Sequence, residues 1–229
     1  MRKTTALVLS LFVFTFLGSL SASEPEMAAT TTFGTIYHLP YRVGLRKIST
    51  LAKTAKFEDL WTYIPVAGVW ADIGYDGNSM VVKVKRKLVM WTSQLETKLA
   101  NSVIVEAHIH VDRNSGVTMW PPSSTDISSL AECKKWFVDE LKVKDVVWVV
   151  CTPSENWILR VSPYLAERLS DKSAKGREYS KAFLDRYCSI VLKHYRRDRR
   201  GKKKEIVLKQ FLREVETIGG VTVRLMKDP

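Results

Sequence analysis

Two histidines and one aspartate are the residues whose types and spacing could do chemistry in this chain. His108 and His110 stand two positions apart in Glu106-Ala107-His108-Ile109-His110, and on a β-strand that spacing points both side chains to the same side. Asp126 ends the segment Ser123-Ser124-Thr125-Asp126, where it is predicted to be the N-cap of a helix. Two imidazoles, one carboxylate and an open fourth position form the ligand set of a catalytic zinc ion that activates water. The pattern therefore predicts a zinc site.

The elements that must position these ligands are a strand and the helix after it. Residues 102–112 alternate as a half-buried strand does, and a loop with Pro121 and Pro122 follows. Apolar residues at helical spacing over 127–141 predict an amphipathic helix. One face of the strand carries Val103, Val105, Ala107, Ile109 and Val111, and the other carries Ile104, Glu106, His108 and His110.

The rest of the chain predicts an α+β domain with a strand-rich middle and a helical carboxyl half. Segments 61–70 and 80–91 are predicted to pair as a hairpin around a turn at 75–78. A short helix is expected at 90–99, strands at 145–151, 156–161 and 221–226, and helices at 177–195 and 205–217. No internal repeat and no glycine-rich phosphate loop is present in the sequence.

Composition excludes several classes of protein. The chain has 229 residues, of which 45% are apolar and 26% charged, so it can bury a core. Only one stretch is apolar enough to meet a membrane, which excludes a polytopic membrane protein. Three cysteines are too few for a disulfide framework or a multi-cysteine zinc cluster. The net charge of +12 makes anionic partners plausible.

The amino terminus has the layout of a secretory signal peptide. Arg2 and Lys3 precede an apolar run at 6–17 and then small residues, so residues 1–22 are predicted to be a cleaved signal. The alternative is an uncleaved membrane anchor, because the stretch 4–23 has no charge. We expect a secreted or periplasmic protein, with a flexible leader at 23–35 and a single domain at 36–229, whose helical carboxyl-terminal extension spans about 165–229.

An oxidising compartment leaves the state of the three cysteines open. Cys133, Cys151 and Cys188 could form one disulfide and leave one thiol, or all three could be buried and free. Nothing in their spacing selects a pair.

The order of the motif resembles the JAMM motif of the JAB/MPN metalloprotease family. His108-Ile109-His110 and, after a loop, Ser123-Ser124-Thr125-Asp126 match its His-x-His and Ser-x-x-Asp parts in type and order. The resemblance covers roughly residues 60–165. It implies a mixed β-sheet flanked by helices, in the layered architecture of cytidine deaminases. In that fold His-x-His ends a strand, the aspartate opens a helix, and a hydrophobic strand and hairpin follow, as 146–161 suggests.

The resemblance also implies a role for each matched residue. His108, His110 and Asp126 would be zinc ligands, and Ser123 would donate a hydrogen bond to the oxyanion of the tetrahedral intermediate. A glutamate from an earlier segment would be the general base. The function implied is an exported zinc-dependent peptidase or isopeptidase-like hydrolase that cuts an amide bond in a peptide or protein substrate by metal-activated water.

The chain departs from the family pattern at three places. Val111 stands where a proline commonly follows His-x-His, and the loop from His110 to Asp126 is longer than usual. Pro65 stands where the glutamate is expected, shortly before Gly68, and proline can neither accept a proton nor bind a metal.

Three carboxylates remain as candidates for the general base. Glu58 is favoured because it lies about the right distance upstream, and Asp59 is its neighbour. Glu106 shares a strand face with His108, which favours a role in orienting an imidazole rather than in taking a proton from water.

Two other functions follow from other features. Without a working glutamate, the chain would be a catalytically silent JAB/MPN-like binding domain, which contacts an anionic partner through a basic run or leaves that run solvated. An amidohydrolase barrel also uses a His-x-His strand, but only 119 residues follow His110, too few for that barrel. The basic residues of the run are Arg196, Arg197, Arg199, Arg200, Lys202, Lys203 and Lys204.

Overall fold

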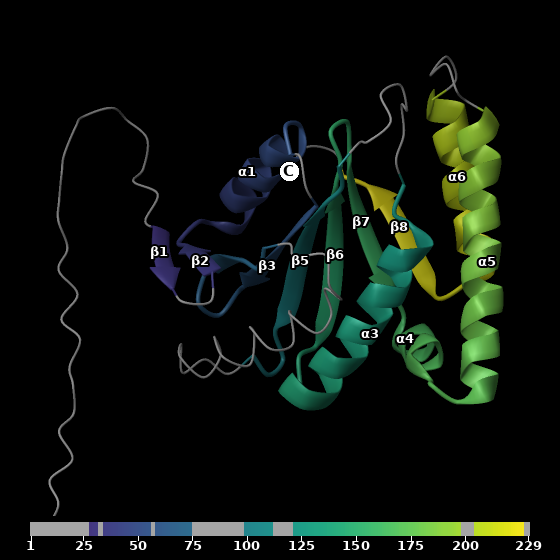
Figure 1. The fold of residues 1–229 in the computed structure, drawn as a ribbon, viewed down its shortest axis with the longest axis horizontal. Helices are drawn as coiled ribbons and strands as arrows, with labels where there is room; N and C mark the ends of the chain where they lie inside the picture. Colours follow the sequence, from purple (N-terminus) through teal and green to yellow (C-terminus); the bar gives the residue numbers. More distant parts are fainter. Residues whose placement is uncertain are drawn as a thin grey trace, which may run out of the picture.

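A mixed sheet of eight strands organises the computed structural model, which describes residues 28–31, 34–55, 58–74, 99–111, 121–197 and 204–226. The strand order across the sheet is β1-β2-β4-β3-β5-β6-β7-β8 (Figure 1). The strands are β1 (Ala28–Thr31), β2 (Gly34–Tyr37), β3 (Asp59–Ile64), β4 (Val69–Asp72), β5 (Val103–Ile109), β6 (Asp145–Cys151), β7 (Asn156–Val161) and β8 (Val221–Leu225). The predicted α+β class with a mixed sheet and flanking helices is confirmed.

Helices cover both faces of the sheet. The described helices are α1 (Tyr41–Ala52), α3 (Ser124–Leu141), α4 (Pro163–Ser170), α5 (Ala174–Arg197) and α6 (Lys204–Ile218). Leu45, Ile48 and Ala52 of α1 pack on one face with Ala107 and Ile109 of β5. The helices α3 to α6 pack on the other face, and Figure 1 shows α3 and α4 between the sheet and α5.

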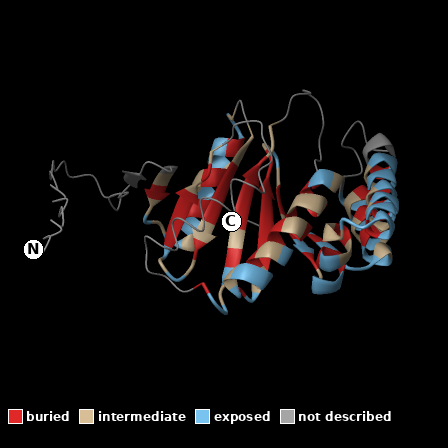
Figure 2. Ribbon diagram, turned by 60° about the horizontal axis from the view of Figure 1, so that its bottom comes forward, coloured by how far each residue is buried: buried red, intermediate tan, exposed pale blue. Residues whose placement is uncertain are grey.

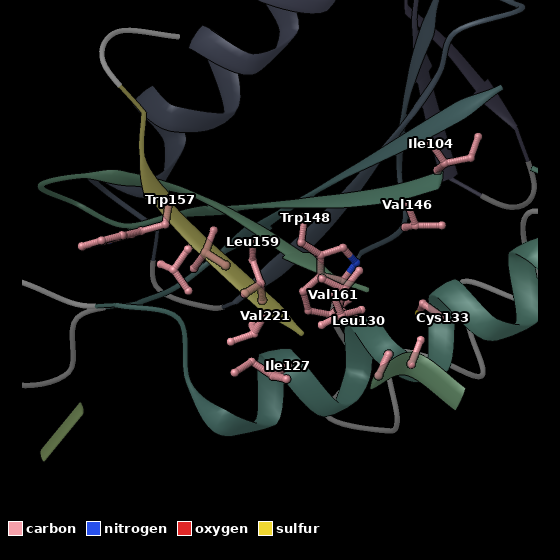
Figure 3. Close-up of a cluster of buried hydrophobic side chains, with 14 of the residues drawn as sticks. Ile104, Ile127, Leu130, Cys133, Val146, Trp148, Trp157, Leu159, Val161 and Val221 are labelled. Atoms are coloured by element: carbon pink, nitrogen blue, oxygen red, sulfur yellow. The ribbon is translucent and has the colours of Figure 1, made fainter. Parts of the chain in front are cut away.

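The larger hydrophobic cluster lies between the sheet and α3 to α6. Figure 3 shows Trp148 of β6 and Trp157 of β7 in it, with Ile127 and Leu130 of α3. These four side chains are fully buried, and Figure 2 shows the central strands mostly in red. The strand predicted over 102–112 is β5, which ends earlier, at Ile109. Its alternation is confirmed there, because Ile104 belongs to this cluster whereas Ala107 and Ile109 belong to the one under α1.

The pairing of β5 with β6 requires a crossover, and that crossover contains α3. These two strands are parallel, and the other pairs of neighbours among the described strands are antiparallel. The chain must therefore cross back between them, and α3 lies in that connection. A crossover leaves from the carboxyl end of the first strand, so the loop before α3 starts where β5 ends.

The predicted hairpin between 61–70 and 80–91 is wrong in its first half. Segment 61–70 is split between β3 and β4, which pair with each other around a turn at 65–68. Pro65 follows the last residue of β3, and Gly68 has φ of 63°, so both residues suit a turn. Their apolar neighbours concealed this turn. The turn at 75–78, the strand at 80–91 and nearly all of the helix at 90–99 lie outside the described residues.

The sheet begins earlier and the helices are more numerous than predicted. Strand β1 and the start of β2 fall inside 23–35, the expected leader, because they pair with each other, and β2 also pairs with β4. Helix α1 was not predicted, although Leu45, Ile48 and Ala52 have helical spacing. Gly44 lets this helix approach the sheet, since a Cβ atom there would lie 2.1 Å from Trp70.

Two further findings concern the compartment. All three cysteines are free, with Cys133 and Cys151 buried and Cys188 exposed. Among the helices that the structure describes, none has the length and apolar character to cross a membrane. The predicted signal peptide at 1–22 lies outside the described residues.

Candidate metal centre

His108, His110 and Asp126 come together in space, with ligand atoms that all lie within 4.8 Å of one another. Asp126 Oδ1 is the common point, 3.2 Å from His108 Nδ1 and 3.2 Å from His110 Nε2. His108 and Asp126 are buried, whereas His110 is partly exposed. The cluster therefore has one side that is accessible from solvent.

The sheet and the crossover place these residues. His108 is in β5 and His110 follows its last residue, while the His110 N–H donates to the carbonyl of Cys151 in β6 at 2.8 Å. That bond continues the parallel pairing beyond β5 and holds the backbone of His110 beside β6. Asp126 lies in the first turn of α3, and its contacts with both imidazoles place that turn beside the carboxyl end of β5.

The sequence predicted Asp126 as the N-cap of α3, and this prediction is wrong. Ser123 is the N-cap and Asp126 is the third helical residue, and the two form a capping box. Asp126 Oδ2 accepts hydrogen bonds from Ser123 N at 2.6 Å and from Ser123 Oγ at 2.9 Å, while the Asp126 N–H donates to Ser123 Oγ. The prediction placed the cap at the acidic residue, although in a Ser-x-x-acid pattern the serine starts the helix.

The capping box gives the two oxygens of Asp126 different partners. Oδ2 is held by Ser123 at the helix start, and Oδ1 faces both imidazoles. Because Oδ2 is bonded twice, the carboxylate has little freedom to rotate. The structure thus aims Oδ1 at the point where His108 and His110 converge.

The charges of the cluster support one another. Burial alone would raise the pKa of Asp126, but hydrogen bonds with His108 and His110 outweigh it and hold the pKa well below its usual range. Burial lowers the pKa of His108, but Asp126 and then Glu58 outweigh it and raise the pKa to about 9. At neutral pH the carboxylate is therefore ionised and His108 carries a proton.

Glu58 lies on the other side of His108. Its Oε2 is 3.8 Å from His108 Nε2, too long for a hydrogen bond but within ion-pair distance. Contact with His108 lowers the pKa of Glu58, and its side chain is 35% exposed. The register that pairs Asp59 with Ile109 brings the residue before β3 to the histidine end of β5.

Asp59 and the segment around Pro65 lie away from the metal cluster. Asp59 accepts hydrogen bonds from Leu60 N and from Trp61 Nε1, and Trp61 packs under α1, on the opposite face of the sheet. Pro65, where the family pattern expects a glutamate, lies at the far end of β3 from Glu58. The structure thus groups Glu58 alone of these residues with the metal cluster.

Glu106 contacts Trp148 rather than an imidazole in the described part of the chain. Its buried carboxylate accepts a hydrogen bond from Trp148 Nε1, and burial raises the pKa of Glu106 to about 7. The ring of Trp148 meets the His108 ring edge on, with centroids 5.8 Å apart. The Trp148 indole thus contacts both Glu106 and His108. Among the described residues, no hydrogen bond joins the Glu106 carboxylate to an imidazole, as its predicted role would require.

Ser123 has a structural role that competes with its predicted one. Its hydroxyl proton is directed at Asp126 Oδ2. Donation to an oxyanion would require the hydroxyl to rotate away from that carboxylate. The predicted residue is thus beside the cluster, with its donor already engaged.

One residue near the site had no signal in the sequence. Tyr187 of α5 donates a hydrogen bond from its hydroxyl to the carbonyl of Pro122, at 2.7 Å. In the sequence Tyr187 belongs to an apolar helical stripe and reads as a core residue, because nothing local indicates its partner 65 positions away.

The basic run lies apart from the cluster in the chain and mostly outside the described residues. Helix α5 ends at Arg197 and α6 begins at Lys204, and residues 198–203 between them are not described. The predicted contact with an anionic partner stays a prediction.

Comparisons with models of known protein families, with curated proteins and with solved structures found no match to the chain. The assignment of a function therefore depends on the geometry of the site itself.

Proposed function

We propose that this protein is an exported zinc-dependent hydrolase of JAB/MPN type, which cuts an amide bond in a peptide or protein substrate. The observation that carries the proposal is the position of Asp126 Oδ1, 3.2 Å from both His108 Nδ1 and His110 Nε2, with Glu58 beside the same histidine. Export depends on the predicted signal at 1–22.

The donor set and its spacing suit zinc. Four ligands at zinc–ligand distances of 2.0–2.1 Å around a tetrahedron stand about 3.3 Å from one another. Asp126 Oδ1 is 3.2 Å from each imidazole nitrogen, close to that spacing. Calcium and magnesium prefer oxygen ligands, so two nitrogens and one carboxylate favour zinc or a similar transition metal.

The order of the elements supports the family assignment. Strand β5 carries His108 and is followed by His110, Asp126 lies in the first turn of α3, and β6 and β7 follow as an antiparallel pair. This is the order that the resemblance to the JAB/MPN family implies.

A bound zinc ion would lower the pKa of a water molecule and polarise the scissile carbonyl. Glu58 is partly exposed and its pKa is lowered, so its carboxylate is ionised. It lies beside Nε2 of His108 whereas Nδ1 faces Asp126, so its side chain would turn past the imidazole to take a proton from water at the centre. Water would add to the carbonyl carbon as its proton passes to Glu58, and the C–N bond would break in a second step, as the oxyanion returns to a carbonyl and Glu58 gives the proton to the leaving nitrogen. Ser123 can donate to the oxyanion once its hydroxyl leaves Asp126 Oδ2.

Metal analysis of the purified protein tests the centre. We expect one zinc per chain in the wild type and none in His108→Ala or Asp126→Ala. His38→Ala is the matched control, because His38 is an exposed histidine of the same chain, and it should retain zinc. Absence of zinc from the wild type, or zinc unchanged in both site variants, would sink the proposal.

Glu58→Gln tests catalysis separately from metal binding. The variant should keep its zinc. Its rate of peptide cleavage should fall by a factor of about 10² to 10⁴, because the amide cannot accept the water proton. The assay is mass spectrometry of a defined peptide mixture incubated with the zinc-loaded wild type and variant. Cleavage at the wild-type rate by Glu58→Gln would remove Glu58 from the mechanism.

The second candidate function is a catalytically silent binding domain that contacts a polyanion. Seven basic residues between Arg196 and Lys204 favour it, since they concentrate charge at the junction of α5 and α6. It predicts binding to a model polyanion such as heparin that weakens with salt and is lost when those residues are neutralised. Polyanion binding that is unchanged by these substitutions would exclude this second function. The position of Glu58 favours the enzyme.

A further inference from the structure

A hydrogen bond from α5 reaches the segment that carries the metal-binding aspartate. The Tyr187 side chain is fully buried, and its hydroxyl donates to the carbonyl oxygen of Pro122 at 2.7 Å. Pro122 is itself buried and directly precedes Ser123, the N-cap of α3. A buried carbonyl needs a donor, so the hydroxyl of Tyr187 has a specific task at this position.

The contacts continue from Pro122 to the imidazoles. Ser123 holds Asp126 Oδ2 through its N–H and its hydroxyl, and Asp126 Oδ1 faces His108 and His110. The N–H that bonds Oδ2 belongs to the peptide unit whose carbonyl accepts from Tyr187. A rotation of this one planar unit would move both bonds together.

The surroundings of Tyr187 agree with this reading. Burial, and then the negative charge of Asp126, raise the pKa of the Tyr187 hydroxyl above its ordinary value, so the hydroxyl stays a donor. Helix α5 packs on α3, and thus a residue outside the sheet reaches the start of the helix.

We propose that Tyr187 is a positioning residue for the metal centre. By fixing the peptide unit between Pro122 and Ser123, it holds the capping box in the orientation that aims Asp126 Oδ1 at the two histidines. The inference rests on the proposed function in one respect, namely that the positioned carboxylate is a metal ligand. The contact of Tyr187 with the capping box can be measured in the metal-free protein.

Tyr187→Phe removes the hydroxyl and keeps the ring in the core. We expect zinc affinity, measured by competition with a chelator, to fall about tenfold, the lower end of the effect of outer-shell partners. The Co²⁺-loaded variant should also show an altered visible spectrum, because the carboxylate ligand is displaced. A purely structural role would lower stability and leave the spectrum unchanged.

Tyr179→Phe is the matched control. Tyr179 lies two turns earlier in α5, where its ring stacks on Phe183 and lies under the guanidinium of Arg168. The same hydroxyl is lost from the same helix, away from Pro122. Zinc affinity and the Co²⁺ spectrum should equal those of the wild type. Equal affinities and spectra in wild type and Tyr187→Phe would overturn the proposal.

Amide hydrogen exchange of the metal-free protein separates this inference from the proposed function. The Asp126 N–H, which donates to Ser123 Oγ, should exchange about tenfold faster in Tyr187→Phe, whereas the amides of α5 should keep their protection. Unchanged exchange at Asp126 would refute the positioning role whether or not zinc binds. If the wild type binds no zinc but exchange responds as expected, the proposed function fails and the contact with the capping box stands.

A double-mutant cycle with Ser123→Ala tests the route. If Tyr187 acts through Ser123, the combined loss of zinc affinity in the double variant should be smaller than the product of the two single losses. Independent, multiplicative losses would show that Tyr187 acts by another route and would overturn the inference.

Discussion

His108 has a carboxylate beside each of its ring nitrogens. Nδ1 lies 3.2 Å from Asp126 Oδ1, and Nε2 lies 3.8 Å from Glu58 Oε2. This arrangement stabilises a positive charge at the centre, either as a proton on the imidazole or as a bound cation. Protons and metal therefore compete for the same residue, and binding of a metal must release the His108 proton.

The stability of the metal-free protein should depend on pH through these residues. The pKa of His108 is 6.5 in the unfolded chain and about 9 in the fold, so its contribution is fully present below 6.5 and is lost as the pH rises to about 9. The pKa of Asp126 is lowered in the fold, so its contribution is present above 3.8 and is lost as the pH falls further.

Urea unfolding in the presence of a chelator measures this dependence. We expect the free energy of unfolding to fall between pH 6.5 and about 9, and the decline to be smaller in His108→Gln. The same alkaline decline in both proteins would show that another group causes it.

Helix α3 is tied to the sheet by a buried lysine near its centre. Lys134 Nζ donates to Asp145 Oδ1 of β6 and to the carbonyl of Val161 in β7, both at 2.6 Å. The side chain is only 6% exposed. This one cation links α3 to two strands and so helps to fix the level at which Asp126 meets the end of β5.

Lys134→Ala should destabilise the protein by about 3 kcal/mol, because it leaves a buried carbonyl without its donor and Asp145 without its cation, although the Val146 N–H still donates to Asp145. Lys135→Ala is the control, since the neighbouring Lys135 forms an exposed pair with Asp139 one turn away. Lys135→Ala should change the free energy of unfolding by no more than about 0.5 kcal/mol. Chemical unfolding of the three proteins checks both values, and equal losses would contradict the role of Lys134.

Local patterns predicted the elements in the middle of the chain. The strands at 145–151 and 156–161 have the predicted bounds, since continuous apolar runs end at clear turn residues. The split of 61–70 into two strands was not predicted, because Pro65 and Gly68 stand among apolar residues that mask a turn. Helix α1 was not predicted, because its apolar residues are few and glycine interrupts them.

The candidate site was predictable where it is local in sequence. The spacing of His108 and His110, and of Ser123 and Asp126, is visible in short segments. The position of Glu58 depends on the register of β3 against β5, and the bond of Tyr187 depends on the packing of α5. Neither is encoded in a local pattern, so the structure was needed to group them with the cluster.

At the scale of the whole molecule, the centre joins elements that are far apart in the chain. It combines the segment before β3, the end of β5 and the start of α3, and α5 supports the last of these. A ligand that binds only this assembled arrangement must stabilise the entire fold.

Zinc should therefore raise the unfolding temperature of the wild type. Free zinc at one hundred times its dissociation constant adds about 2.7 kcal/mol. For a chain of this size that corresponds to about 5 to 10 °C. Thermal unfolding with zinc, with magnesium and with a chelator measures the shift. Magnesium should have no effect, and Asp126→Ala should not respond to zinc. An equal response in that variant would place the metal elsewhere.

The different partners of the two Asp126 oxygens make Asp126→Asn a separation-of-function variant. Asparagine matches the shape of aspartate, and its one oxygen can take the place of Oδ2 and accept from Ser123. Its amide group would then face the imidazoles and could not bind a cation. We expect the metal-free variant to keep the capping bonds but to lose the stabilisation that the carboxylate gives to protonated His108. Its stability should therefore decline less between pH 6.5 and about 9, and it should take up no zinc. Asp126→Ala should lose both the cap and the metal. Comparing the two variants by unfolding and metal analysis would therefore separate the capping role of the carboxylate from its role as a metal ligand.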